Sequence, residues 1–127
     1  MDGTTSVLFS ATLERLRRRV RRQIHQGGQY SGKTVNILAA IATYLTENPG
    51  TIATVTSMSF PHLKAGALRD FETYVLPLFK GKIRSYHKTN HVVTWKNGSL
   101  MEFKTYLTEY DARGAKRNIL FINEANT

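Results

Sequence analysis

The sequence predicts an α/β fold with a mostly parallel sheet, helices on both faces of the sheet and an inserted β-hairpin. Segments with the composition of strands alternate along the chain with segments whose apolar residues have helical spacing. In addition, Asn97-Gly98 lies between two runs of alternating polarity, which is a strong signal for a hairpin. At 127 residues, the chain has the length of one small domain.

The first part of the chain predicts helix, strand and helix in that order. SATLERLRRRV (10–20) has three apolar residues at helical spacing and Arg on the other faces, which predicts a short amphipathic helix. RRQIHQ (21–26) alternates and runs into glycines, as a strand entering a loop does. TVNILAAIATYL (34–45) is apolar on nearly every side and is followed by the stop signal TENPG (46–50). It predicts a helix that is buried on most sides.

The middle of the chain predicts a strand and a second covering helix. TIATVTS (51–57) is rich in β-branched residues. Ser59 is suited to cap a helix that has Pro61 in its first turn, and Pro77 makes the last turn of that helix doubtful. The residues expected to line one face of this helix are Leu68, Phe71, Val75 and Leu78.

Short strands are expected in the last third of the chain, at 83–87, 91–95 and 100–106. ILFI (119–122) is apolar throughout, which is typical of a parallel strand covered on both faces. Trp95 is expected to pack against the sheet, as hairpin aromatics usually do, and not to stack on a base.

Composition and charge exclude some classes of protein. The chain has no cysteine, which excludes a disulfide scaffold and thiolate metal sites. No apolar run approaches the roughly 18 residues that cross a bilayer, so a soluble intracellular protein is expected. The net charge of +9 comes from two segments: residues 1–26 have six Arg and two acids (+4), and residues 80–104 have six Lys or Arg and one acid (+5). Such segments predict either a polyanionic partner, with nucleic acid first, or two solvated faces.

One motif matches a phosphate-binding loop at every required position. GGQYSGKT (27–34) fits G-x-x-x-x-G-K-[ST] and lies between a predicted strand and a predicted helix. Glycines allow the backbone to fold around phosphate with its N–H groups pointing inward, and the helix N-terminus adds partial positive charge. Lys33 is suited to reach the β- and γ-phosphates, and the Thr34 hydroxyl is suited to bind Mg²⁺. The predicted phosphate-binding residues are Gly27, Gly28, Gln29, Tyr30, Ser31, Gly32, Lys33 and Thr34.

ILFINEA (119–125) is the natural partner of this loop. It predicts a buried strand parallel to the first one, with polar residues at the edge where open α/β sheets bind ligands. Glu124 would then be the general base that activates water. Asn123 stands where an Asp commonly supports the water shell of the magnesium ion. Its amide oxygen can still accept a hydrogen bond from a metal-bound water, but it brings no negative charge.

GGQYSGKT together with ILFINEAN resembles the N-terminal ATPase domain of the large terminase subunit of tailed bacteriophages, over residues 20–126. The resemblance implies a P-loop NTPase core of the ASCE type, with ATP and Mg²⁺ as ligands. It also implies a motor that packages double-stranded DNA into proheads. Partners in that family are the portal, the small terminase subunit and the other members of a homo-oligomeric ring. The implied location is the host cytoplasm, transiently at the prohead portal, and no membrane is involved.

The resemblance also gives a role to Arg113. Related terminases have a similar Arg-Gly upstream of the catalytic strand, which implies that Arg113 is an arginine finger acting on ATP held by a neighbouring subunit. The alternatives are a surface Arg beside Asp111, or a finger supplied by Lys116 or Arg117. Gln29 replaces the commoner Arg in the loop, so the role of that Arg in sensing phosphate does not transfer.

The resemblance covers only part of a packaging motor, so the fold is expected to be incomplete. Residues 1–127 are expected to be the N-terminal part of an ATPase domain, with a basic segment at 1–20 and a core fragment at 21–127. Nuclease activity is expected to be absent, because a two-metal nuclease needs several convergent carboxylates and the nine acids are scattered.

Two other functions are compatible with the sequence. One is another nucleic-acid-dependent P-loop ATPase, such as a helicase-like protein. The other is a basic nucleotide- or nucleic-acid-binding module without turnover, which Asn123 and the short length favour. For the Arg cluster at 15–22, DNA contact, subunit contact and a plain solvated face are all open.

Overall fold

The computed structural model describes residues 3–18, 23–26, 31–105 and 117–123, with the backbone alone for 3–7, 23–26, 31 and 32. The helical elements are α1 (Gly3–Arg18), α2 (Ser31–Glu47), α3 (Phe60–Leu63), the π-helical segments η1 (Lys64–Leu68) and η2 (Phe71–Val75), and the 3-10 segment η3 (Leu76–Lys82). The strands are β1 (Gln23–Gln26), β2 (Ile52–Ser57), β3 (Ile83–His87), β4 (Val92–Trp95), β5 (Leu100–Thr105) and β6 (Ile119–Asn123).

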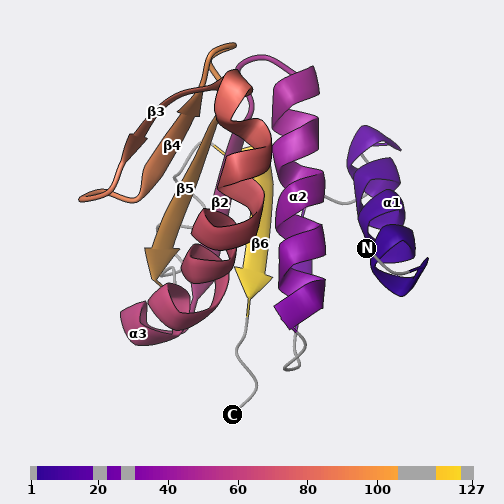
Figure 1. Ribbon diagram of the computed structural model, residues 1–127, viewed down its shortest axis with the longest axis horizontal. Coiled ribbons are helices and arrows are strands. Elements are labelled where there is room, and N and C mark those ends of the chain that lie inside the picture. The colour runs from indigo at the N-terminus through magenta and orange to yellow at the C-terminus, as the bar shows by residue number, and fades with distance from the viewer. Residues whose placement is uncertain (1–2, 19–22, 27–30, 106–116, 124–127) are drawn as a thin grey trace.

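The strands form one mixed sheet in the order β1-β6-β2-β5-β4-β3 (Figure 1). The four strands β1, β6, β2 and β5 run parallel to one another. Strands β4 and β3 follow on the β5 side of the sheet, and each is antiparallel to its neighbour. The α/β class, the mostly parallel sheet and the inserted hairpin are therefore confirmed. The predicted pairing of the first strand with the last is also confirmed, because β1 lies directly beside β6 and parallel to it.

Helices α2 and α3 lie on the same face of the sheet (Figure 1), and α2 packs against η1 and η2. The connections β1 to β2 and β2 to β5 cross the sheet in the same direction. Right-handed crossovers in one direction place both connections on one face. Helices on both faces were expected. Among the described helices α2 and α3 cover one face and α1 lies against α2, so a helix on the opposite face stays a prediction.

Helix α2 forms the centre of the core. Its buried apolar residues are Ile37, Leu38, Ala40, Ile41, Ala42, Tyr44 and Leu45. They occupy most sides of the helix, as the sequence predicted, because α1, the sheet and η2 all surround it. Each Leu or Ile side chain that is fully removed from water contributes about 1.5–3 kcal/mol relative to an exposed one.

Helix α1 packs on α2 through Leu13 and Leu16, which are both buried. The helix was expected to begin at Ser10 but begins at Gly3, so that boundary was wrong. Leu8 and Phe9 also pack against the core, so the apolar face extends further toward the N-terminus than the predicted range.

The segment after β2 is capped as predicted and then departs from a regular α-helix. The Ser59 hydroxyl accepts a hydrogen bond from the His62 backbone N–H, and Pro61 lies in the first turn. The π-helical segments and the 3-10 segment then change the number of residues per turn. Leu78 is consequently 73% exposed, so its predicted place on the buried face was wrong.

The buried residues of that face are the other three, Leu68, Phe71 and Val75. Pro77 lies at the start of the 3-10 turn, where the predicted helix was doubtful. The Leu78 error has a simple cause: the 3.6-residue period was continued into the 3-10 segment η3, which has about three residues per turn.

The β4–β5 hairpin turns at Asn97-Gly98, as predicted. Gly98 has φ +91°, a conformation that favours glycine. Trp95 is 1% exposed, which confirms that it packs in the core.

Burial alternates along β6, which was expected to be covered on both faces. Ile119 and Phe121 are fully buried under the helices, whereas Leu120 and Ile122 on the other face are half-buried. The described helices explain the difference, since they cover only the first of these faces.

Candidate functional site

Four parallel strands end at the same edge of the sheet, and each ends on a polar residue. Gln26 of β1 is paired with Asn123 of β6, and Ser57 of β2 is paired with Thr105 of β5. Because Thr56 is paired with Ile122, the next residues, Ser57 and Asn123, are level with each other. Gln, Asn, Ser and Thr therefore form a continuous row across the carboxyl edge of the sheet, where open α/β sheets bind ligands. We call these four residues the carboxyl row.

The N-terminus of α2 lies at this same end of the molecule (Figure 1). The helix begins at Ser31, and four residues (27–30) separate it from Gln26, the last residue of β1. No acidic residue lies in its first turn, so its own side chains leave the partial positive charge of the helix end unopposed. Lys33 is exposed and Thr34 is 5% exposed. The first turn therefore offers both a cation and a sheltered hydroxyl near the end of β1.

Asn123 lies at the carboxyl edge of the sheet, next to the helical segment η1. It is the last residue of β6 and is 7% exposed. A Cβ atom at Gly66, in η1, would lie 3.6 Å from the Asn123 amide nitrogen. The π-helical segment thus packs directly against this amide. π-Helical segments are rare and are frequent at functional sites, which makes this contact notable.

The structure brings together part of the predicted site. Ser31, Gly32, Lys33 and Thr34 begin α2, and Asn123 ends the neighbouring parallel strand β6. The predicted residues Gly27, Gly28, Gln29, Tyr30, Arg113 and Glu124 lie outside the described residues. The described geometry is therefore that of the two elements that flank the glycine-rich loop.

Two hydroxyls at the end of β2 were not predicted as site residues. Thr56 is 3% exposed and Ser57 is 1% exposed, and neither hydroxyl has a hydrogen-bond partner among the described residues. A buried polar group without a partner is uncommon and calls for an explanation. The only signal in the sequence is that TVTS ends an apolar strand with hydroxyl residues, which is also ordinary strand composition.

Asp70 is a third buried polar residue that was not predicted. It lies between η1 and η2, is 2% exposed, and its Oδ1 has no hydrogen-bond partner among the described residues. Burial raises the pKa of this carboxyl group, and the Arg69 guanidinium, 3.9 Å away, opposes the shift weakly.

The donor set fits a magnesium ion only when it is bound together with a nucleotide. Mg²⁺ prefers oxygen ligands and keeps several waters, and protein sites for nucleotide-bound Mg²⁺ use one or two side chains plus phosphate oxygens. Thr34 and Asn123 offer neutral oxygens from the two flanking elements. Without a carboxylate at Asn123, phosphate oxygens would have to supply most of the negative charge.

The fold and this edge define the chain as an α/β protein with a polar site at the carboxyl ends of its parallel strands. Comparisons with protein-family models, with curated proteins and with solved structures give no match. None of the helices in the described ranges is long and apolar enough to cross a membrane.

Proposed function

We propose that the chain is an ATP-hydrolysing P-loop domain of the ASCE type, and that it is the DNA-packaging motor domain of a phage terminase large subunit. The observation that carries the proposal is the order of elements around GGQYSGKT: strand β1 precedes this motif, helix α2 begins within it, and β6 lies parallel to β1. This pairing puts Asn123 next to the last residue of the strand that leads into the loop. The chemistry of the loop supports the nucleotide part, and the resemblance of GGQYSGKT and ILFINEAN supports the terminase part.

In this proposal each residue has a separate task. The loop amides and Lys33 bind the phosphates, and Thr34 is a ligand of the magnesium ion. Asn123 accepts a hydrogen bond from the water shell of the ion. Glu124 takes a proton from the attacking water, and Arg113 stabilises negative charge on the phosphoryl group in a neighbouring subunit. Mg²⁺, when bound, neutralises charge that develops on the phosphate oxygens.

The biological setting follows from the same proposal. Double-stranded DNA is the translocated partner, and the portal and the small terminase subunit are the protein partners. The working form is a homo-oligomeric ring in the host cytoplasm at the prohead portal. The chain itself has no nuclease activity.

A specific observation favours a second candidate, a basic module that binds nucleotide without turnover. Asn123 is neutral and buried, and it occupies the position where a carboxylate would strengthen metal binding. If the metal is held too weakly, the site binds nucleotide phosphates through Lys33 and the loop but does not hydrolyse them.

Nucleotide binding and ATP hydrolysis, measured in parallel, separate the two candidates. We expect Lys33→Ala to lose both, because it removes the cation that holds the phosphates. Glu124→Gln is expected to bind ATP with Mg²⁺ as the parent chain does and to lose turnover by about 10²-fold or more. Lys64→Ala is the matched control, since Lys64 is an exposed lysine on η1.

The motor proposal fails if the parent chain binds ATP but does not hydrolyse it, even when concentrated and supplied with double-stranded DNA. That result would support the module without turnover. If neither ATP nor ADP binds, or if Lys33→Ala binds as well as Lys64→Ala, both candidates fail.

A further inference from the structure

Basic side chains follow the outer hairpin of the sheet. Strands β3 and β4 are the last two strands on one side, and β3 is the edge strand. Five exposed basic residues lie on this hairpin or directly beside it, and we call them the basic hairpin surface: Lys80, Lys82, Arg84, Lys88 and Lys96. None of the five has an ion pair among the described residues.

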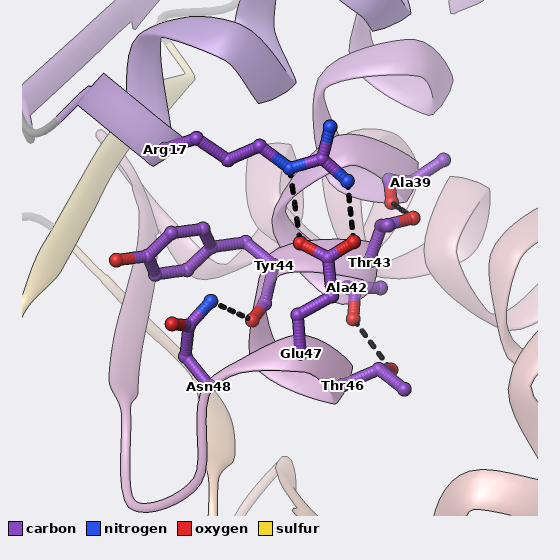
Figure 2. Close-up of polar contacts among 8 residues, drawn as sticks. All are labelled: Arg17, Ala39, Ala42, Thr43, Tyr44, Thr46, Glu47 and Asn48. Atoms are coloured by element: carbon purple, nitrogen blue, oxygen red, sulfur yellow. Dashed lines mark hydrogen bonds and ion pairs between the residues drawn. The ribbon is translucent and has the colours of Figure 1, made fainter.

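The other basic segment of the chain is different in this respect. On α1, Arg17 forms two hydrogen bonds to the Glu47 carboxylate of α2, with Nε to Oε1 at 3.1 Å (Figure 2). Arg18 pairs with Glu14 one turn away at 2.6 Å. Part of the positive charge of α1 is therefore neutralised within the molecule, and Arg17 helps attach α1 to α2. Of the other Arg residues in that segment, Arg19, Arg21 and Arg22 lie outside the described residues.

Two of the described acids lie next to the hairpin, and each interacts with a residue outside the basic hairpin surface. Glu102 on β5 accepts a hydrogen bond from the Thr54 hydroxyl at 2.7 Å and pairs with Lys104 at 3.6 Å. Glu72 on η2 accepts a hydrogen bond from the Tyr86 hydroxyl. Among the described residues, neither carboxylate forms an ion pair with the five basic side chains, whose charge can attract a polyanionic partner.

The aromatic residues of the hairpin are also engaged. The Trp95 ring is buried and its N–H donates to Thr46, and the Tyr86 ring packs edge-on against Phe71 at 6.4 Å. A site for single-stranded nucleic acid needs exposed aromatic rings on which bases stack. The exposed large apolar residues among those described are Met58, Phe60, Tyr74 and Leu78. None of them lies on β3 or β4, and the Phe60 ring, beside the β3–β4 turn, packs against the His91 ring at 5.3 Å. Single-strand stacking and insertion into lipid are therefore both disfavoured.

We propose that the basic hairpin surface contacts the phosphate backbone of double-stranded DNA. From Lys82 to Lys88 the chain extends by about 20 Å at roughly 3.3 Å per residue. That length matches about six base pairs at 3.4 Å each, so several phosphates lie within reach of flexible Lys and Arg side chains. The inference rests on the proposed function for the choice of DNA as the partner, but its geometric basis is independent of the nucleotide site.

Salt-dependent binding to a short DNA duplex tests this surface in the absence of nucleotide. The test variant is Lys82→Gln, Arg84→Gln and Lys88→Gln combined. The matched control is Arg15→Gln, Arg18→Gln and Lys64→Gln combined, which removes the same three charges from exposed positions outside the hairpin. Each phosphate contact contributes about 0.9 to the slope of log affinity against log salt, so the test variant is expected to reduce this slope by about 2.7. The control is expected to change it by less than about 1.

A charge-preserving variant, Lys82→Arg with Arg84→Lys and Lys88→Arg, is expected to keep the parental slope and shows that loss of charge causes the effect. Equal losses in the test and control variants would overturn the proposal in favour of a general effect of net charge. Preferential binding of single strands, or equal competition by polyglutamate, would overturn the choice of duplex DNA.

The outcome is separable from that of the proposed function. Lys33→Ala is expected to bind duplex DNA as the parent chain does when nucleotide is absent. If ATP neither binds nor is hydrolysed while the hairpin variant still loses duplex binding, the surface stands and the motor function falls.

Discussion

The indole N–H of Trp95 donates a hydrogen bond to the Thr46 hydroxyl at 2.9 Å and so connects the β4–β5 hairpin to the last turn of α2. Beside it, the Asn97 side-chain amide donates to the carbonyls of Leu45 and Thr46 at 2.8 and 3.1 Å. The hairpin turn therefore satisfies two carbonyls that the end of a helix leaves without partners. In the functions proposed above, these contacts join the DNA surface to the helix whose other end begins at the phosphate-binding loop.

Thr46→Val is expected to lower the free energy of unfolding by about 1–3 kcal/mol, because it leaves the buried indole N–H without an acceptor. Thr43→Val is the matched control. Both hydroxyls donate to the carbonyl four residues earlier at 2.8 Å (Figure 2), but only Thr46 also accepts from Trp95. Denaturant unfolding measures the difference. Equal destabilisation by the two variants would show that the bond to Trp95 contributes nothing.

Helix α1 is expected to depend on apolar burial more than on its ion pair. Leu16 is fully buried between α1 and α2, and Leu16→Ala is expected to cost about 2–5 kcal/mol in unfolding free energy. Arg17→Gln breaks an exposed pair with Glu47, and its smaller effect is expected to disappear as salt is raised. Unfolding at low and high salt measures both. A larger loss for Arg17→Gln than for Leu16→Ala would contradict this order.

Asp70 is expected to make stability depend on pH. Burial raises the pKa of its carboxyl group in the folded state, so the folded protein holds this proton more tightly than the unfolded chain does. Stability from this group is present below the unfolded pKa and is lost as pH rises through the folded pKa. Asp70→Asn removes the buried charge, so it is expected to be more stable than the parent chain at neutral pH, with the difference shrinking toward acid pH.

Unfolding free energies of the two proteins across the acid range test this direction. Glu14→Gln is the control, because Glu14 is an exposed acid on α1 whose ion pair with Arg18 is also exposed. A difference between Asp70→Asn and the parent chain that grows toward acid pH would contradict the assignment.

The fold class could be predicted because each strand is marked by local composition. The β-branched run of β2 and the Asn97-Gly98 turn specify strands and a hairpin without reference to the rest of the chain. The departures at Leu78 and at the start of α1 depend on tertiary packing. Leu68, Phe71 and Val75 keep their predicted burial in the two π-helical segments, and Leu78 departs from it in the 3-10 segment η3, where the helix tightens to about three residues per turn.

The site residues could be predicted where a sequence motif fixes their spacing. They could not be predicted where their position depends on the pairing register of two strands. Lys33 and Thr34 belong to the motif that follows β1, and Asn123 belongs to the motif on β6. The structure pairs these two strands directly. Ser57 joins the carboxyl row only because β2 pairs with β6 in one particular register. A shift of a single residue would have turned its side chain to the other face of the sheet.

Ser57 is expected to matter for nucleotide binding and not for stability. Its buried hydroxyl has no partner among the described residues, so Ser57→Ala is expected to change the unfolding free energy by less than about 0.5 kcal/mol. If the hydroxyl bonds a nucleotide or its water shell, affinity falls by about 3- to 10-fold, the value of one hydrogen bond. Ser99 is the matched control, a buried serine whose hydroxyl donates to the Asn48 carbonyl at 2.7 Å and accepts from the Thr51 N–H at 3.0 Å.

Ser99→Ala is expected to give the reverse pattern, a loss of about 1–3 kcal/mol in stability with nucleotide affinity unchanged. Titration with ATP and denaturant unfolding of both variants decide the point, and unchanged affinity in Ser57→Ala would remove this residue from the site.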